Sequence, residues 1–284
     1  MEDFYSEQLA RTHQMIAENL GDEMNGIVIE RAVLGVFFCS VWLSNGASGL
    51  CATPMTAIPE AICCPSSAKA FPTPGKQRGR KIKDLLDDLY SPHPLRRALA
   101  LAGLNALADH IRLREPQNDG WRVESGDAYD VLTIRPESKV VLVGAFPPYM
   151  KKLRALSVPF ALMELNPSIL KPEELPFHVS GAEAEAKLRA ADIAIVTGTV
   201  LLNGSFDNLA KLLPMTACMA LIGPTVPLFP KAFEGTPVKV LGGISVHNGR
   251  DLMDLVAEAG SGYHFFKEAV ERVVLVKTPI SDAR

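Results

Sequence analysis

The first 20 residues repeat apolar positions at the three- and four-residue spacing of an amphipathic helix. The pattern predicts a helix over residues 4–20 that ends at Gly21, because glycine commonly follows the last helical turn. From residue 26 to 51, β-branched and aromatic residues dominate, and Asn45-Gly46 is a hairpin turn signal. This stretch predicts two or three antiparallel strands.

Proline and glycine then interrupt the pattern. Residues 53–81 contain five prolines and two glycines, which predicts a long loop. Helical patterns follow at residues 82–90 and 94–111, and the second begins with a proline, which the first helical position tolerates. Residues 1–125 are therefore predicted to form a small α+β domain.

After residue 120 the pattern changes to short, nearly continuous apolar runs that alternate with helical segments. The predicted strands are residues 140–143, 160–165, 193–197, 219–223 and 238–241. The predicted helices between and after them are residues 150–156, 182–191, 206–213 and 251–259. Apolar strands alternating with helices indicate a parallel sheet covered on both faces. Residues 126–284 are therefore predicted to be a Rossmann-like α/β domain.

Ligands bind beyond the carboxyl ends of the strands in such sheets. The first strand ends in Gly144, but Pro147 and Pro148 stand where a dinucleotide-binding turn needs glycines and free N–H groups. Glu164 nevertheless lies 20 residues after Gly144, at the position of an acid that hydrogen-bonds ribose hydroxyls. The prolines thus argue against a conventional NAD site, whereas the position of Glu164 argues for one.

The later strands also end in turns that contain glycines and polar residues. These residues either contact a ligand or, in the case of the glycines, only allow the chain to turn tightly from strand to helix. The candidate ligand-binding residues at the strand ends are Gly144, Phe146, Glu164, Thr197, Gly198, Thr199, Asn203, Gly204, Gly223 and Thr225. Ser205 is a candidate N-cap for the helix that follows Gly204. Free amides at that helix start could receive an anionic group.

For a metal ion, the candidate ligands are Glu164, His178 and His247, of which His247 is expected to point toward the strand-end crevice. No pair of histidines has the four-residue spacing of a helical ligand motif, and a lone histidine is more often a surface or capping residue. Cys63 and Cys64 are adjacent, which suits a soft metal but rarely allows both to bind one ion.

Composition narrows the class of protein. Hydrophobic residues make up 48% and charged residues 21%, and the net charge is −3, so a nucleic-acid partner is not expected. No apolar stretch has the length of a membrane span, and the first 20 residues lack a signal-peptide pattern, so a cytoplasmic protein is expected. The five cysteines include no C-x-x-C pair, which argues against a disulfide framework or a zinc ribbon.

A basic segment holds five positive charges within eight residues: Lys76, Arg78, Arg80, Lys81 and Lys83. It could dock an anionic partner, but acidic residues follow it and no aromatic residues interrupt it, which favours a solvated loop.

These motifs resemble a family known as "putative heavy-metal chelation". The resemblance covers most of the chain and rests on six ordered segments, at residues 103–106, 144–147, 164–167, 197–199, 202–204 and 223–228. It implies a domain like the N-terminal part of enolase packed on a Rossmann-like domain, with a site in the cleft between them and a role in chelating metal. The chain departs from the family pattern at Val200, often threonine, and at His247, often acidic.

Two functional hypotheses follow. In the first, a cleft between the two domains binds a heavy or transition metal ion, or a small anionic ligand, with Glu164 and His247 as ligands. In the second, the chain is an enzyme that uses a nucleoside-containing cofactor such as S-adenosylmethionine or a nucleotide, with Glu164 on the ribose. The sequence shows no catalytic set, and a homo-oligomer is compatible with either hypothesis.

Overall fold

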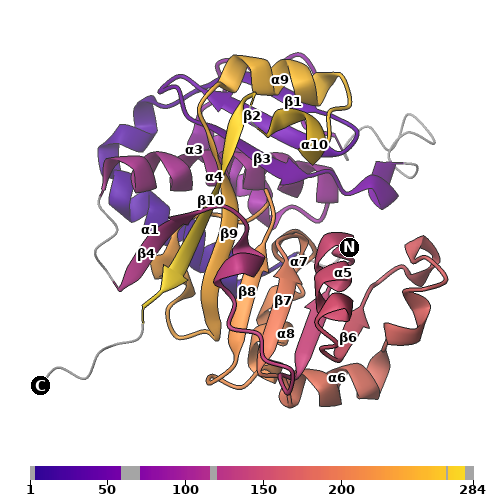
Figure 1. Cartoon of the computed structure of the whole chain (residues 1–284). Coiled ribbons are helices and arrows are strands. Elements are labelled where there is room, and N and C mark those ends of the chain that lie inside the picture. Colours follow the sequence, from indigo (N-terminus) through magenta and orange to yellow (C-terminus); the bar gives the residue numbers. More distant parts are fainter. Residues whose placement is uncertain (1–3, 59–70, 116–119, 267, 279–284) are drawn as a thin grey trace, which may run out of the picture.

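A seven-stranded sheet forms the centre of the computed structural model, which describes residues 4–58, 71–115, 120–266 and 268–278 (Figure 1). The strands are β4 (Trp121–Ser125), β5 (Val140–Val143), β6 (Phe160–Met163), β7 (Ile193–Thr197), β8 (Cys218–Ile222), β9 (Val238–Val246) and β10 (Val270–Lys277). Their order is β4-β10-β9-β8-β7-β5-β6, with β9 through β6 parallel and the other two antiparallel.

All five predicted strands are present and parallel, which confirms the predicted α/β class with a Rossmann-like sheet. Strand β9 continues to Val246, through two glycines, where the sequence predicted an end at residue 241. Strands β4 and β10 were not predicted. Because β4 pairs with β10, residues before the predicted boundary at 126 belong to the large sheet.

Helices cover both faces of this sheet. The helices of this half of the chain are α5 (Pro147–Ala155), α6 (Gly181–Arg189), α7 (Thr199–Asn203), α8 (Phe206–Leu212), α9 (Gly249–Ala257) and α10 (Gly262–Phe265). Leu142 of β5 packs in one apolar cluster with Leu153 of α5, whereas its neighbour Val141 packs in another with Leu188 of α6. Since successive strand residues point to opposite faces, α5 and α6 lie on opposite sides of the sheet.

The smaller part of the molecule is α+β, as predicted. It contains α1 (Glu7–Leu20), the antiparallel strands β1 (Ile29–Leu34), β2 (Phe38–Leu43) and β3 (Ser48–Ala52), and the helices α3 (Ile82–Leu86) and α4 (Pro94–Arg114). Figure 1 shows this sheet beside the upper ends of β9 and β10, with α9 next to β1 and β2. The Ser6 hydroxyl accepts a hydrogen bond from Leu9 N–H at the start of α1, and Gly21, with φ +50°, follows its end.

Short 3₁₀ turns connect these elements. They are η1 (Gly21–Gly26), η2 (Met55–Ala57), η4 (Asp87–Tyr90), η5 (Ala128–Val131), η6 (Pro167–Ile169), η7 (Leu175–Phe177) and η8 (Pro230–Phe233). The predicted long loop at 53–81 is described at both ends only, and Cys63 and Cys64 lie outside the described residues.

Helix α4 is buried on nearly all sides because β2 and β3 of the small sheet pack against it together with α1, α3, α7 and η4. Asp109 and Arg112 of α4 form an ion pair at 2.7 Å. The Ser245 hydroxyl of β9 donates to Asp109 at 2.7 Å and accepts from Arg112 at 3.0 Å. This buried network joins the two parts of the chain.

Helix α1 also crosses between the parts. The N–H groups of Glu7 and Gln8, at its first turn, donate to the Asp207 carboxylate of α8 at 2.9 and 3.0 Å. The Gln8 side-chain amide donates to Ala232 O at 2.9 Å. An acidic side chain is stabilised at a helix N-terminus, so Asp207 fixes the N-terminal helix on the second half of the chain.

The closest approach between α4 and β3 is at Gly49 and gives a testable prediction. A Cβ atom at Gly49 would lie 2.2 Å from Ala102 O and 2.5 Å from Ala106 N, both backbone atoms of α4. We expect Gly49→Ala to lower the free energy of unfolding by about 3 kcal/mol or more, because helix and strand must separate. Gly26→Ala is the matched control, since nothing lies within 4 Å of its Cβ position. Equal denaturation midpoints for the two variants would contradict the prediction.

Candidate functional site

The parallel strands reverse their direction of winding between β5 and β7. Strand β6 lies to one side of β5, and the chain then crosses back to β7 on its other side. Such a switch point opens a crevice at the carboxyl ends of the strands, because the connections on either side lie on opposite faces. Gly144 ends β5 with φ +93°, and a Cβ atom there would lie 2.9 Å from Thr197 Cγ2 of β7. Glycine is thus required for the two turns to meet.

A pocket of about 270 Å³ lies at this switch point. Five of the predicted ligand-binding residues line it together: Gly144, Glu164, Thr197, Thr199 and Asn203. The rest of its lining is mostly apolar and includes Val143, Met163, Leu165, Val179, Ala184, Val200 and Leu209. We call it the switch-point pocket.

Backbone hydrogen bonds hold the Glu164 carboxylate in place. Oε2 accepts from Ala145 N–H at 3.2 Å, and Oε1 accepts from Asn166 N–H at 3.1 Å. A carboxylate offers about four acceptor positions, so two remain for a ligand. The side chain is half-buried and therefore reachable from the pocket.

Hydroxyl and amide groups stand on the β7 side of the pocket. Thr197 Oγ1 and Thr199 Oγ1 lie 3.1 Å apart, so one donates to the other. Asn203 Oδ1 accepts from both the N–H and the hydroxyl of Ser205, at 3.0 and 2.7 Å. Ser205 occupies the N-cap position of α8, as predicted, but its hydroxyl is turned back to Asn203 and makes no capping bond.

The start of α5 offers few amides to a phosphate. Pro147 and Pro148 are the first residues of α5 and carry no N–H, and Tyr149 N–H is bonded to Phe146 O at 2.9 Å. A diphosphate would therefore find none of the donors that residues 147–149 would supply in a dinucleotide-binding turn.

The other predicted residues lie elsewhere. Phe146 and Gly223 line a second pocket on the far side of the β5–α5 turn. Thr225 is buried, and its hydroxyl accepts from Ala52 N–H of β3 at 2.9 Å. Gly198 packs on Thr225 and Val226, where its Cβ would lie 2.7 Å from Val226 Cγ2. The predicted residues thus divide among two pockets and a closely packed junction.

Arg97 of α4 contacts the last turn of α7. Its Nε donates to Leu202 O at 3.1 Å, and its guanidinium lies 3.8 Å from the centre of the Phe4 ring. Gly204, with φ +78°, approaches the same ring, since its Cβ would lie 2.8 Å from Phe4 Cε2. Burial lowers the pKa of Arg97 to about 10, so it stays charged at neutral pH. Gly204 therefore contacts Phe4 of the protein itself and is not open to a ligand at that position.

The predicted metal ligands do not form one site. Strands β5, β7 and β8 separate the end of β6, where Glu164 lies, from β9, which precedes His247. Four strand spacings amount to roughly 19 Å. His178 Nε2 lies 3.2 Å from the backbone O of Glu164, and His247 is exposed. No group of three His, Cys, Asp or Glu side chains among the described residues could hold a metal ion, so these residues do not fit one.

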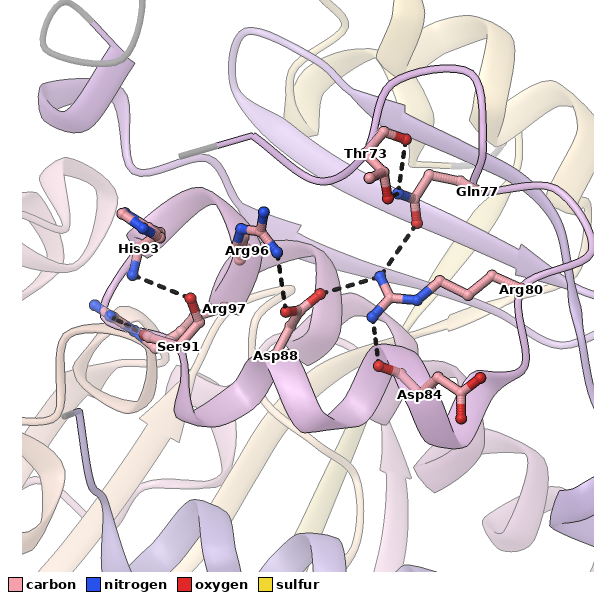
Figure 2. A network of polar contacts seen from close by, with 9 residues as sticks. All are labelled: Thr73, Gln77, Arg80, Asp84, Asp88, Ser91, His93, Arg96 and Arg97. Carbon is pink, nitrogen blue, oxygen red and sulfur yellow. Dashed lines mark hydrogen bonds and ion pairs between the residues drawn. The ribbon is translucent and has the colours of Figure 1, made fainter. Parts of the chain in front are cut away.

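The basic segment is partly folded onto its own helices. Arg80 forms an ion pair with Asp88 at 3.0 Å and also donates to Asp84 O (Figure 2). Figure 2 also shows Gln77 between Thr73 and Arg80, and Arg96 on the other side of Asp88. Arg80 thus serves a local network, which favours the structural interpretation of this segment.

No helix within the described ranges is long and apolar enough to cross a membrane.

Comparison with known proteins gives a family and two structural neighbours. A family model described as "Putative heavy-metal chelation" matches residues 127–275, and a second model of the same description matches residues 17–108. No curated protein matches the chain.

Two solved structures of proteins with unknown function, from the family of the first model, resemble the chain. The one from Pyrococcus horikoshii has a TM-score of 0.71 and 18% identity, covering 94% of this chain and 98% of its own. The one from Desulfitobacterium hafniense has a TM-score of 0.66 and 19% identity, covering 93% of this chain and 99% of its own. At these identities the likeness shows the fold.

The contact between Gly144 and Thr197 gives a testable prediction. We expect Gly144→Ala to lower the free energy of unfolding by about 1–2 kcal/mol because of the positive φ, and by about 1–3 kcal/mol more because of the clash with Thr197. The control Gly126→Ala should show only the first of these losses. At Gly126 φ is +107° and nothing lies within 4 Å of the Cβ position. Adding Thr197→Ser to Gly144→Ala should restore part of the stability, because it removes the methyl group. Denaturant titration of the three variants measures the loss from the positive φ and the loss from the clash separately. If Thr197→Ser restores no stability to Gly144→Ala, the contact between residues 144 and 197 is not the cause of the loss.

Proposed function

The chain belongs to the family described as "Putative heavy-metal chelation", and from its switch-point pocket we propose that it binds a nucleoside-containing small molecule. The carboxylate of Glu164 carries this proposal. Backbone N–H groups fix it at the end of the second parallel strand, and its remaining acceptor positions can take the two hydroxyls of a ribose.

The rest of the pocket suits the base of a nucleoside. Apart from Glu164 and the hydroxyls next to β7, the lining is largely apolar, which favours the burial of a flat, uncharged base. Leu165 is 86% exposed beside Glu164 and supplies an apolar surface that a ligand would cover.

The missing amides at the start of α5 select among nucleoside ligands. Because Pro147 and Pro148 cannot donate, a diphosphate gains less stabilisation there than at a dinucleotide-binding turn. The proposal therefore favours a nucleoside with an uncharged or cationic extension, such as S-adenosylmethionine, over a dinucleotide.

Ligand binding tests this function. We expect adenosine and S-adenosylmethionine to raise the unfolding temperature of the protein, and 2′-deoxyadenosine to do so less. Glu164→Gln should weaken adenosine binding by about 10- to 150-fold, the value of a hydrogen bond to a charged group. Calorimetric titration measures the affinities, and Glu185→Gln, an exposed carboxylate on α6, is the control. If none of the adenosine compounds binds, the proposal is wrong.

Heavy-metal chelation, which the family description suggests, finds no donor set in the described residues. We therefore expect Glu164→Ala and His247→Ala to leave the metal content of the untagged protein unchanged. Elemental analysis after titration with zinc and with copper measures that content. Loss of a stoichiometric metal ion in either variant would show that these side chains bind metal and would contradict this interpretation.

A further inference from the structure

A second pocket lies across the β5–α5 turn from the switch-point pocket. It measures about 290 Å³ and borders the end of β8, the middle of β9, the β10 strand and the start of α5. Gly144 lines the first pocket and Phe146 lines the second, so one short turn separates them. Gly223 also lines it, and because no atom lies within 4 Å of its Cβ position, the space above it is open.

Aromatic rings form one wall of this pocket. The rings of Phe146 and Tyr149 are stacked, with centroids 5.4 Å apart and planes 11° apart. The Tyr149 hydroxyl donates to Asp127 Oδ1 at 2.6 Å. Burial, and then the bond to Asp127, raises the pKa of Tyr149, so its hydroxyl stays protonated and can donate to Asp127. The wall is therefore aromatic, and the Tyr149 ring is tied to Asp127.

Two opposite charges border the same pocket without meeting. Asp127 Oδ1 accepts from both Tyr149 and Tyr129 N–H, whereas no described residue donates to its Oδ2. The Arg272 guanidinium lies 4.3 Å from the centre of the Phe266 ring and forms no ion pair with any described carboxylate. Asp127 and Arg272 thus line the same pocket, and each keeps hydrogen-bonding capacity that no described residue uses.

We propose that this pocket binds a small zwitterion of the amino-acid class, with its carboxylate on Arg272, its ammonium on Asp127 and its apolar side chain against Phe146 and Tyr149. The arginine fork matches a carboxylate, and an ammonium group is attracted to both a carboxylate and an aromatic face. A simple anion would be repelled by Asp127 and a simple cation by Arg272. Only a ligand that carries both charges satisfies both side chains.

Blocked amino acids test this assignment directly. Calorimetric titration with L-leucine and L-phenylalanine should show binding, and the N-acetyl and the amide form of each should bind at least tenfold more weakly. Equal binding of the N-acetyl forms would show a plain anion site, and no binding of either free amino acid would show that the pocket takes another ligand. Each of these results overturns the proposal.

Two variants separate the charges. Arg272→Met should lose discrimination against the amides, and Asp127→Asn, which keeps an oxygen for Tyr149, should lose discrimination against the N-acetyl forms. Arg250→Met, at an exposed arginine of α9, is the control for removing a positive charge. If Arg272→Met and Asp127→Asn remain folded at the temperature of the titration and the discrimination persists, the proposal is wrong. Glu164→Gln should leave amino-acid binding unchanged, so this site can fail or succeed independently of the nucleoside site.

Discussion

The burial of α4 on nearly all its sides is the constraint on which the rest of the structure depends. A helix with apolar residues around its whole circumference is stable only when other elements cover every face. One side of α4 lies so close to β3 that Gly49 has no room for a side chain. On another side, the ion pair of Asp109 and Arg112 is hydrogen-bonded to Ser245 of β9. The two parts of the chain therefore pack as one body, and the loops after β7 and β8 are pressed into their junction. The open pockets lie beside this junction, where α4 does not reach.

The sequence predicts the elements with strong local patterns. The five parallel strands, the opening helix and the antiparallel strands all follow from apolar runs or helical spacing that neighbouring residues suffice to reveal. Strand β10 was missed although its residues are as apolar, and β4 was missed because only its pairing with β10 gives it a role. The glycines inside β9 appeared to end that strand, but the antiparallel pairing with β10 carries it to Val246.

The site was predictable in part for the same reason. The rule that ligands bind where parallel strands end placed Gly144, Glu164 and Thr197 together, and they line one pocket. The same rule cannot tell which side of a strand end a residue faces, so Phe146 was grouped with Gly144 although it faces another pocket. Nor could it show that Glu164 and His247 lie at strands separated by three others, because strand order depends on crossovers that sequence spacing does not specify. Arg272 and Asp127 carried no signal, since their shared pocket exists only after β10 joins the sheet.

The bonds from α1 to Asp207 also determine when the protein can fold during synthesis. The two partners are about 200 residues apart in the chain, so a ribosome that adds roughly 5–20 residues per second reaches the second one roughly 10 to 40 s after the first. During that interval α1 can pack on α4 of its own half, but η8 and α8, which cover the rest of it, have not yet been made. The amino-terminal part is thus expected to complete its packing only after the carboxyl-terminal part emerges.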